Sequence, residues 1–322
     1  MMPLVSIIIP TYNRDGIVQQ AIDSVIAQSY SNWECLVIDD GSDDQTVVSL
    51  DAYLKKDKRI QYFNRNRLPK GAPTCRNIGL KHAMGDYIVF LDSDDYLLPF
   101  CLEQRVKNID KYHDFDFFVF PMGIKKNNII LKQEIPQCDD YLIPFLSANL
   151  LWQTMCPIWK VEFIKQLEGF TEGYPRFNDP ELMIRAFLNV KPGNYLVCME
   201  MDYDSVHIRE ENHEKTFKNK VYESLKLFIP DISKALKENN KIEHKKHLSN
   251  YLHLWFRYFY MPLSDRKNLG QSLYLILIFC KYGILSLKKT TSLATRFLLY
   301  VFSYYCLKQP IDKITSKAFY IN

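Results

Sequence analysis

The chain of 322 residues carries a formal net charge of +4 and contains 47% hydrophobic residues, enough apolar surface for a sizeable core. Its length exceeds the roughly 100 to 200 residues of one domain and predicts a large domain with an appendage. No uninterrupted apolar stretch reaches the roughly 18 residues of a membrane-spanning helix, and the eight cysteines include no CxxC pair, which argues against a spanning helix and a CxxC site.

The charge is unevenly distributed along the chain. From Lys241 onward, thirteen Lys and Arg face three Asp and Glu, a net charge of +10, whereas residues 1–240 carry 28 against 34, a net charge of −6. Because Ser6 to Pro10 has the pattern of a core strand and not of a signal peptide, and because the cysteines are scattered, we expect a reduced protein in the cytoplasm.

Strand and helix patterns alternate through the first hundred residues. Runs of apolar and β-branched residues predict strands at residues 4–9, 35–38, 59–63 and 87–91. Helical spacing of apolar residues predicts helices at residues 17–26, about 43–57 and 75–84. Strands that alternate with helices at this pace predict an α/β fold with a doubly wound, mostly parallel sheet.

Residues 86–95, with the sequence DYIVFLDSDD, combine a buried strand with a cluster of acid. The apolar run ends at Asp92, Asp94 and Asp95, which place three carboxylates within four residues. Like charges this close repel, so the cluster must be solvated or must bind a cation. Hard divalent ions such as Mg²⁺ and Mn²⁺ prefer such oxygen ligands. A solvated turn whose aspartates cap the next helix is the alternative.

Polar residues also follow the first two predicted strands. Thr11, Tyr12 and Asn13 come after the first strand, and Asp39 and Asp40 come after the second. Ligands of open α/β sheets lie outside the carboxyl ends of the strands. Three polar strand ends therefore predict a single ligand cleft at one edge of the sheet.

Further elements are expected after Pro99. Helical patterns cover residues 100–113, 142–151 and 161–167 and a segment from Pro180, and strand patterns cover residues 115–120, 155–159 and 195–201. Residues 124–131 predict a hairpin whose turn contains Asn127 and Asn128. Residues 170–179 are rich in Gly, Pro and aromatic residues, a composition typical of a substrate-facing loop.

From residue 215 onward, long helical patterns replace the strand patterns, which predicts a domain at residues 1–214 and a helical C-terminal region at residues 215–322. Its apolar, aromatic runs adjoin basic residues, so we expect these helices to lie on an anionic membrane surface, where each Lys or Arg contributes about 1 kcal/mol. A bundle that packs on the first domain or on a second copy of the chain, as a homo-oligomer, is the alternative, and the two are compatible.

Four motifs, in the correct order, resemble the family 2 glycosyltransferases. They are VSIIIPTYNR from Val5, VIDDGS from Val37, RNIGLKHAMGDYIVFLDSDD from Arg76, and the later GF and ND pairs at Gly169 and Asn178. The resemblance covers roughly residues 3–210. It implies a GT-A fold with a Rossmann-like nucleotide-binding half, a nucleotide-activated sugar as donor, and inversion of the anomeric centre.

The resemblance also implies roles for residues at the strand ends. Tyr12 would stack on the nucleobase, and Asp40, or its neighbour Asp39, would accept a hydrogen bond from the base. Arg67, Lys70 and Arg76 would complement a diphosphate, although solvated basic residues explain them almost as well. The expected nucleotide-sugar-binding residues are Pro10, Thr11, Tyr12, Asn13, Asp39, Asp40, Arg67, Arg76, Asp92, Ser93 and Asp94.

In the same resemblance, Asp92 and Asp94 form a DxD motif that contacts ribose and a divalent cation, Mn²⁺ or Mg²⁺, which Asp95 shares. Asp179 is the expected general base, with Glu181 as the fallback, and a helix cap before Pro180 is the alternative role of Asp179. From the segment that follows, His207 and His213 could reach the metal or the phosphates, although a lone histidine is more often structural or solvated.

The implied function is that of an inverting glycosyltransferase. It would move a sugar from a nucleotide-sugar donor, with a UDP-sugar favoured, to a hydroxyl of a saccharide or lipid-linked acceptor in cell-surface polysaccharide biosynthesis. We expect a cytoplasmic protein with peripheral contact at the inner face of the cytoplasmic membrane, and not a nucleic-acid partner. A nucleotidyltransferase would need a glycine-rich loop after the first strand, where the chain has only Gly16.

A binding protein without transfer activity is the alternative from another functional class. It would be a catalytically inactive, sugar-nucleotide-binding subunit of a membrane-attached complex. Asn178 favours this alternative, because it replaces the first acid of the pair that the family usually carries.

Overall fold

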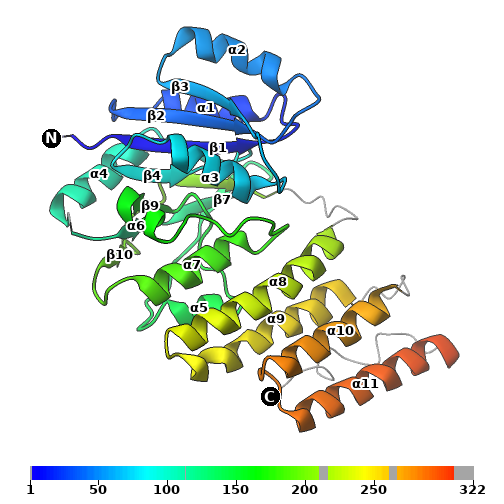
Figure 1. The fold of residues 1–322 in the computed structure, drawn as a ribbon. Coiled ribbons are helices and arrows are strands. Elements are labelled where there is room, and N and C mark those ends of the chain that lie inside the picture. The colour runs from blue at the N-terminus through cyan, green and yellow to red at the C-terminus, as the bar shows by residue number, and fades with distance from the viewer. Residues whose placement is uncertain (1, 113, 210–216, 261–266, 308–322) are drawn as a thin grey trace. The chain divides into compact units, whose positions relative to one another are not determined.

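The computed structural model describes residues 2–112, 114–209, 217–260 and 267–307 (Figure 1). The chain forms two compact units, each made of three segments. The first unit comprises Met1–Asp139, Leu151–Tyr174 and Asn189–Asn212, and the second comprises Asp140–Leu150, Pro175–Leu188 and His213–Asn322. The last segment of the second unit begins next to the boundary expected at residue 214, but two earlier segments also belong to that unit.

A seven-stranded sheet forms the centre of the first unit. Its strands are β1 (Val5–Thr11), β2 (Trp33–Asp39), β3 (Ile60–Asn64), β4 (Tyr87–Phe90), β6 (Phe117–Val119), β9 (Pro157–Lys160) and β10 (Tyr195–Val197), in the order β10-β6-β9-β4-β1-β2-β3. Only β9 runs antiparallel to its two neighbours. Every residue of β1, β2 and β4 is buried, as expected for apolar strands covered on both faces. The predicted α/β fold with a mostly parallel sheet is confirmed.

Helices separate the strands of this sheet along the chain. They are α1 (Val18–Ile26), α2 (Thr46–Lys56), α3 (Ala72–His82), α4 (Cys101–Lys111) and α6 (Val161–Gln166). Helix α3 packs closely against β1 and β2, and a Cβ atom on Gly79 would lie 2.4 Å from Ile8 and 3.0 Å from Ile38. The glycine therefore allows α3 to approach the strands whose ends carry the candidate site.

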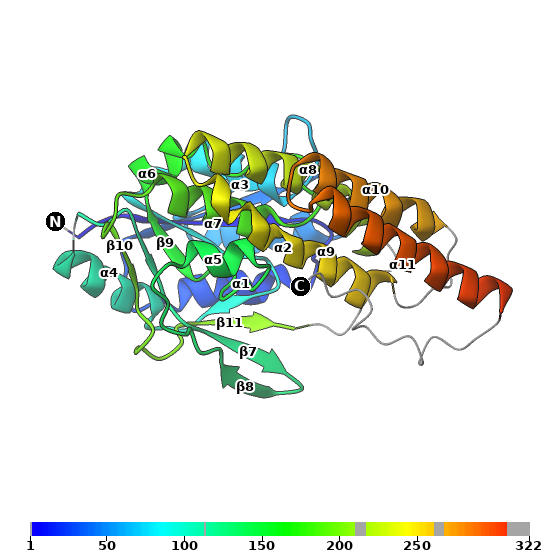
Figure 2. The same ribbon diagram turned by 90° about the horizontal axis from the view of Figure 1, so that it is seen from below.

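A second, four-stranded sheet also belongs to the first unit (Figure 2). Its strands are β5 (Tyr96–Leu97), β7 (Met122–Lys126), β8 (Ile129–Lys132) and β11 (Ser205–Ile208), in the order β5-β11-β7-β8. The predicted hairpin is confirmed, because β7 and β8 pair antiparallel across Asn127 and Asn128, which adopt left-handed φ angles of 48° and 66°. The strand expected at residues 195–201 ends at Val197, and β5 and β11 were not predicted.

The second unit is helical in the part of the chain that the structure describes. It contains α5 (Leu142–Leu146), most of α7 (Asn178–Asn189), α8 (Phe217–Glu238), a 3₁₀ helix (Ile242–Leu248), α9 (Ser249–Leu254), a π-helical turn (Trp255–Tyr260), α10 (Lys267–Lys281) and α11 (Leu287–Cys306). Helix α7 begins at Asn178, two residues before the predicted start at Pro180. The predicted helical C-terminal region is thus confirmed.

Buried aromatic residues hold the separate segments of the second unit together. The Tyr251 hydroxyl donates a 2.8 Å hydrogen bond to the Phe145 carbonyl oxygen, and the Tyr251 ring packs against Phe177 and Phe228. These contacts join α5 and the start of α7 to the C-terminal helices. None of the helices in the described ranges combines the length and the apolar character needed to cross a membrane.

Candidate active site

The carboxyl ends of β1, β2 and β4 meet at one edge of the seven-stranded sheet. Thr11 at the end of β1 pairs with Asp39 at the end of β2, and the Asp40 N–H donates to the Thr11 carbonyl at 2.8 Å. On the other side of β1, the Leu91 N–H donates to the Ile8 carbonyl at 3.0 Å, just where β4 ends. The expectation that these three strand ends share one edge is confirmed.

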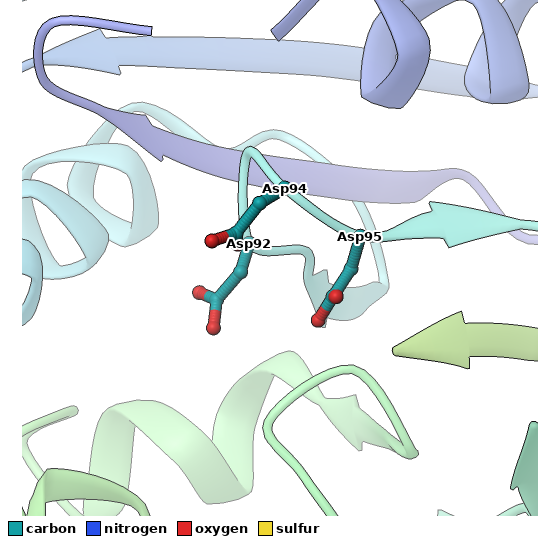
Figure 3. Close-up of side chains that lie close together, drawn as sticks. All are labelled: Asp92, Asp94 and Asp95. Carbon is teal, nitrogen blue, oxygen red and sulfur yellow. The ribbon is translucent and has the colours of Figure 1, made fainter. Parts of the chain in front are cut away.

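Three carboxylates gather on the loop between β4 and β5 (Figure 3). Asp92, Asp94 and Asp95 each offer an oxygen, and these oxygens lie within 4.8 Å of one another. A turn closed by a 3.0 Å hydrogen bond from the Asp95 N–H to the Asp92 carbonyl brings them together. The side chains of Asp92 and Asp94 are 36% and 30% exposed, and Asp95 is buried.

Each of the three carboxylates has a different partner from another part of the first unit. The Arg76 guanidinium on α3 lies 2.5 Å from Asp92, and the Arg14 guanidinium lies 3.1 Å from Asp94. Asp95 contacts β11, where its Oδ1 lies 3.0 Å from His207 Nδ1 and accepts the Ile208 N–H at 2.9 Å. The orientation of the acidic loop is therefore fixed by groups from α3, the loop after β1, and β11.

The surroundings of the loop shift the pKa values of its groups. Burial, reinforced by the charge of Asp92, raises the pKa of Asp94. Burial raises the pKa of Asp95 to about 6, although its contact with His207 works against this shift. Burial alone would lower the pKa of His207, but the hydrogen bond and the charge of Asp95 outweigh it and raise that pKa. Burial and mutual repulsion thus disfavour the charged forms of Asp94 and Asp95 even beside Arg14 and His207.

The donor set of the loop fits a divalent cation. Arg76 contacts Oδ1 of Asp92 and Arg14 contacts Oδ2 of Asp94, so Oδ2 of Asp92 and Oδ1 of Asp94 are the oxygens that can act as ligands. Carboxylate oxygens at partly exposed positions are the ligands that Mg²⁺ and Mn²⁺ take in sites completed by phosphate or water. Asp92 and Asp94 would hold such an ion, and Asp95 would support it from the buried side.

The two adjacent acids after β2 differ in their surroundings. Asp39 closes a turn, because its carboxylate accepts the N–H groups of Gly41 and Ser42 at 3.2 and 2.9 Å and also the Ser42 hydroxyl. Asp40 Oδ1 receives the Arg65 guanidinium at 2.5 Å and the Gly71 N–H at 3.1 Å. Asp39 therefore shapes the strand end, and Asp40 is the better candidate for contact with a ligand.

At the end of β1, Tyr12 is exposed and Asn13 links two strand ends. The Lys70 ammonium lies 3.5 Å from the centroid of the Tyr12 ring. Asn13, at a φ of 49°, donates to the Asp43 carboxylate at 2.7 Å and receives the Asp43 N–H at 3.0 Å. Pro10 and Thr11, by contrast, lie buried within β1. Tyr12 thus presents an exposed ring at this strand end, and Asn13 connects the end of β1 to the loop after β2.

The predicted basic residues Arg67 and Arg76 also differ in their contacts. Arg67 forms a bidentate pair with Glu172, whose second hydrogen bond measures 2.6 Å. Arg76 is almost fully buried beneath Asp92 and lies 4.8 Å from the centroid of the Phe170 ring. Ser93 is buried between Asp92 and Asp94. Arg76 therefore acts on the acidic loop, whereas Arg67 anchors the loop that carries Glu172.

Three contributors to this edge were not predicted from the sequence. Arg14 pairs with Asp94, Arg65 pairs with Asp40, and Glu172 holds Arg67. Arg14 stands within the first motif, so its position beside Tyr12 was a usable signal. Arg65 and Glu172 stand outside the motifs, and only the fold brings them to their partners.

The two candidate bases belong to the second unit, at the start of α7. The Asn178 side-chain amide donates to the Asp179 carboxylate at 2.9 Å, and Asp179 is half-buried. Glu181 is buried, and both of its oxygens receive the Arg185 guanidinium, at 2.6 and 2.8 Å. Because α7 starts at Asn178, Asp179 lies in the first helical turn and not before it. His213 lies outside the described residues.

Comparison with known proteins gives a family match for the first part of the chain. Residues 6–157, slightly less than half of the chain, match the model of "Glycosyl transferase family 2". This match and the glycosyltransferases among the relatives support a family 2 glycosyltransferase. Among the curated relatives is the Escherichia coli UDP-Glc:alpha-D-GlcNAc-diphosphoundecaprenol beta-1,3-glucosyltransferase WfgD, 39% identical over 134 residues, 42% of this chain and 52% of the relative.

A second relative is the Staphylococcus aureus poly(ribitol-phosphate) beta-N-acetylglucosaminyltransferase TarS, 26% identical over 249 residues, 73% of this chain and 42% of the relative. The matches span 17% and 44% of the length of two uncharacterized glycosyltransferases, from Rickettsia felis and Haemophilus influenzae. The chain thus corresponds to only part of the curated relatives that it matches.

Solved structures establish the GT-A fold. The crystal structure of S. aureus TarS 1–349 in complex with UDP-GlcNAc aligns with a TM-score of 0.69 at 19% identity, over 95% of this chain and 92% of that chain. The mannosyltransferase PcManGT from Pyrobaculum calidifontis, in complex with GDP-Man and Mn²⁺, aligns with a TM-score of 0.54 at 16% identity, over 100% of this chain and 85% of that chain. At these identities the likeness concerns the fold.

Proposed function

We propose that the chain is an inverting, metal-dependent glycosyltransferase that uses a UDP-sugar as donor and a saccharide or lipid-linked hydroxyl as acceptor. The observation that carries the proposal is the loop of Asp92, Asp94 and Asp95, oriented by three separate elements at the sheet edge that also bears Tyr12 and Asp40. This is where open α/β sheets bind ligands.

The donor would be bound by side chains of the first unit. Tyr12 is exposed and offers a ring for stacking on the base, and Asp40 offers an acceptor for a base N–H. Lys70 lies on the Tyr12 ring, so it would move aside or contact the diphosphate when a base stacks there. The names of WfgD and of the TarS complex, which contain UDP-Glc and UDP-GlcNAc, support a UDP-sugar.

A divalent cation, Mn²⁺ or Mg²⁺, would be held by Asp92 and Asp94 and would neutralise the charge that develops on the departing nucleoside diphosphate. The chain's own part is to keep these carboxylates in place. Arg76 contacts Oδ1 of Asp92 and Arg14 contacts Oδ2 of Asp94, so the second oxygen of each carboxylate can face an ion. His207 and the Ile208 N–H fix Asp95 behind them. The solved complex of PcManGT with GDP-Man and Mn²⁺ supports such an ion.

Asp179 is the proposed general base. Inversion requires a group that takes the proton from the acceptor hydroxyl as it attacks the anomeric carbon from the opposite face. Glu181 is less suited, because it is buried and both of its oxygens are engaged by Arg185. Asp179 is half-buried in the first turn of α7 and carries a hydrogen bond from Asn178, which orients the carboxylate.

Exposed side chains on α11 support the proposal that the helical region contacts a membrane surface. Helix α11 exposes Leu298, Leu299 and Phe302, and its first turn exposes Lys288 and Lys289. An apolar stripe beside cations suits peripheral contact with the inner face of the cytoplasmic membrane or with a second copy of the chain.

We further propose that residues 1–214 hold the transferase activity, in cell-surface polysaccharide biosynthesis.

The decisive experiment measures UDP release from UDP-glucose and UDP-GlcNAc by the purified chain, with Mn²⁺ or with EDTA. Mn²⁺ should support release, and Asp94→Asn should lower it roughly a hundredfold or more and weaken Mn²⁺ binding in calorimetry, because one ligand oxygen is lost. Asp51→Asn, on the surface of α2, is the matched control and should change neither.

Two results would contradict the proposal. Equal UDP release in Mn²⁺ and in EDTA would contradict the proposed role of the metal. UDP release by Asp94→Asn at the rate of the unaltered chain would contradict it too. Binding of UDP-sugars with no release and no transfer under any condition would instead favour the inactive, sugar-nucleotide-binding subunit.

A further inference from the structure

A groove on the four-stranded sheet lies on the same face as His207. Strand β7 lies between β11 and β8 (Figure 2). Ile124 of β7 pairs with both His207 of β11 and Leu131 of β8, so these three side chains lie on one face of the sheet. Beyond β11, the Arg209 N–H donates to the Lys125 carbonyl at 3.1 Å and continues the alternation, which places Arg209 on this face as well. The face therefore extends outward from the residue that contacts Asp95.

The groove combines aliphatic and cationic side chains. It has a volume of about 610 Å³, within the range of roughly 300 to 1,000 Å³ typical of small-ligand sites. Its apolar lining includes Ile129 and Leu131, which are 62% and 68% exposed, and its charged lining is Lys126, Lys132 and Arg209. No acidic residue lines it within the described ranges, and Glu134 pairs with Lys132 at 3.5 Å.

We propose that this groove binds the prenyl diphosphate part of a lipid-linked acceptor. Its aliphatic side chains match a hydrocarbon chain, and its cations match the phosphates that link the chain to a sugar. The inference deepens the proposed function, on which the role of this ligand as an acceptor rests. His207 connects the groove to the acidic loop, so the sugar end of the ligand would lie toward Asp95.

The size of the surface distinguishes this ligand from larger partners. A stable protein interface buries about 800 Å² on each partner, and a bilayer-binding face needs a broad apolar stripe. The groove instead offers the three aliphatic side chains Ile124, Ile129 and Leu131 between cations. That arrangement suits one extended hydrocarbon chain with a charged end.

The test measures binding of farnesyl diphosphate to the full chain by calorimetry. EDTA is present, so that no metal links the phosphates to the acidic loop. Arg209→Ala and Leu131→Ser should each weaken binding roughly tenfold, because one removes a charged hydrogen-bond donor and the other removes apolar contact. Both side chains are at the surface, so the variants should fold, which thermal unfolding checks.

Lys125→Ala is the matched control, because Lys125 follows Ile124 on β7 and its side chain lies on the opposite face of the sheet. It should bind farnesyl diphosphate like the unaltered chain. Equal weakening by Lys125→Ala, unaltered binding by both groove variants, or no binding at all would overturn the proposal.

Two further probes distinguish a prenyl diphosphate from other classes of ligand. Inorganic diphosphate that binds as tightly as farnesyl diphosphate would indicate a phosphate site and overturn the proposal. Phosphatidylglycerol vesicles that bind in an Arg209-dependent way, while farnesyl diphosphate does not, would indicate a membrane-binding surface and overturn it too. Groove-dependent farnesyl diphosphate binding by a chain that never releases UDP would support the groove while refuting the proposed transferase.

Discussion

At the scale of residues, the structure separates acids that are equivalent in the sequence. Asp39 and Asp40 are neighbours with the same chemistry, yet Asp39 closes a turn and Asp40 contacts Arg65 and the Gly71 N–H. The acidic loop itself was predictable, because three carboxylates directly follow an apolar run. Its partner Arg65 and the role of Asp39 as a turn residue were not predictable, since both depend on contacts between strand ends.

The two candidate bases give a prediction at this scale. Asp179→Asn should keep UDP binding within about twofold and lower transfer to the proposed saccharide or lipid-linked acceptor by roughly 10²- to 10⁴-fold, because Asn cannot take the proton. Glu181→Gln should retain transfer but lose roughly 1 to 3 kcal/mol of unfolding free energy, since it weakens a buried pair with Arg185. Transfer assays and chemical denaturation measure the two effects.

The reverse pattern would identify the other acid. Transfer that survives in Asp179→Asn and disappears in a folded Glu181→Gln variant would make Glu181 the base.

At the scale of elements, the long buried strands were predictable and the short strands were not. Runs such as those of β1, β2 and β4 are buried on both faces, so their apolar sequences are distinctive. Strand β5 has two residues, and β11 has four residues that pair with partners more than eighty positions earlier. The contact between Asp95 and His207 depends on both short strands, and for this reason the sequence left the role of His207 open.

The close packing of α3 on β1 and β2 gives a prediction for an element. Gly79→Ala should lower the free energy of unfolding by roughly 1 to 3 kcal/mol, because the added methyl group would overlap with Ile8 and press on Ile38. Helix propensity alone would make the same change stabilising by about 1 kcal/mol. Urea denaturation decides between the two signs, and Lys81→Ala, at an exposed position of the same helix, is the control.

At the scale of the whole molecule, the helical C-terminal region was predictable, but the two earlier segments that pack with it in the second unit were not. Residues 140–150 and 175–188 are short segments between strands, and the sequence pattern places them in the first domain. The structure assigns them to the second unit, with Phe145 and Phe177 in contact with Tyr251. Segments as short as these have no pattern that reveals which distant helix will cover them.

The exposed side of α11 gives a prediction at this scale. Replacing Lys288 and Lys289 with Glu should weaken binding to phosphatidylglycerol vesicles by roughly tenfold or more, because each cation near an anionic surface contributes about 1 kcal/mol. UDP release should not change. The matched control replaces Lys234 and Lys237 of α8, and vesicle co-sedimentation at low and high salt measures the effect. Equal binding by both double variants would indicate that α11 has another partner.

The interleaved order of the two units has a consequence for biosynthesis. When the ribosome has completed the first two hundred residues, α5 and α7 have already been made, but Tyr251 and the other residues that cover Phe145 and Phe177 have not. These aromatic side chains therefore stay exposed to water, or bound by a chaperone, until translation approaches its end. A gene shortened after residue 214 would encode a permanently uncovered intermediate, and such a product should accumulate in inclusion bodies.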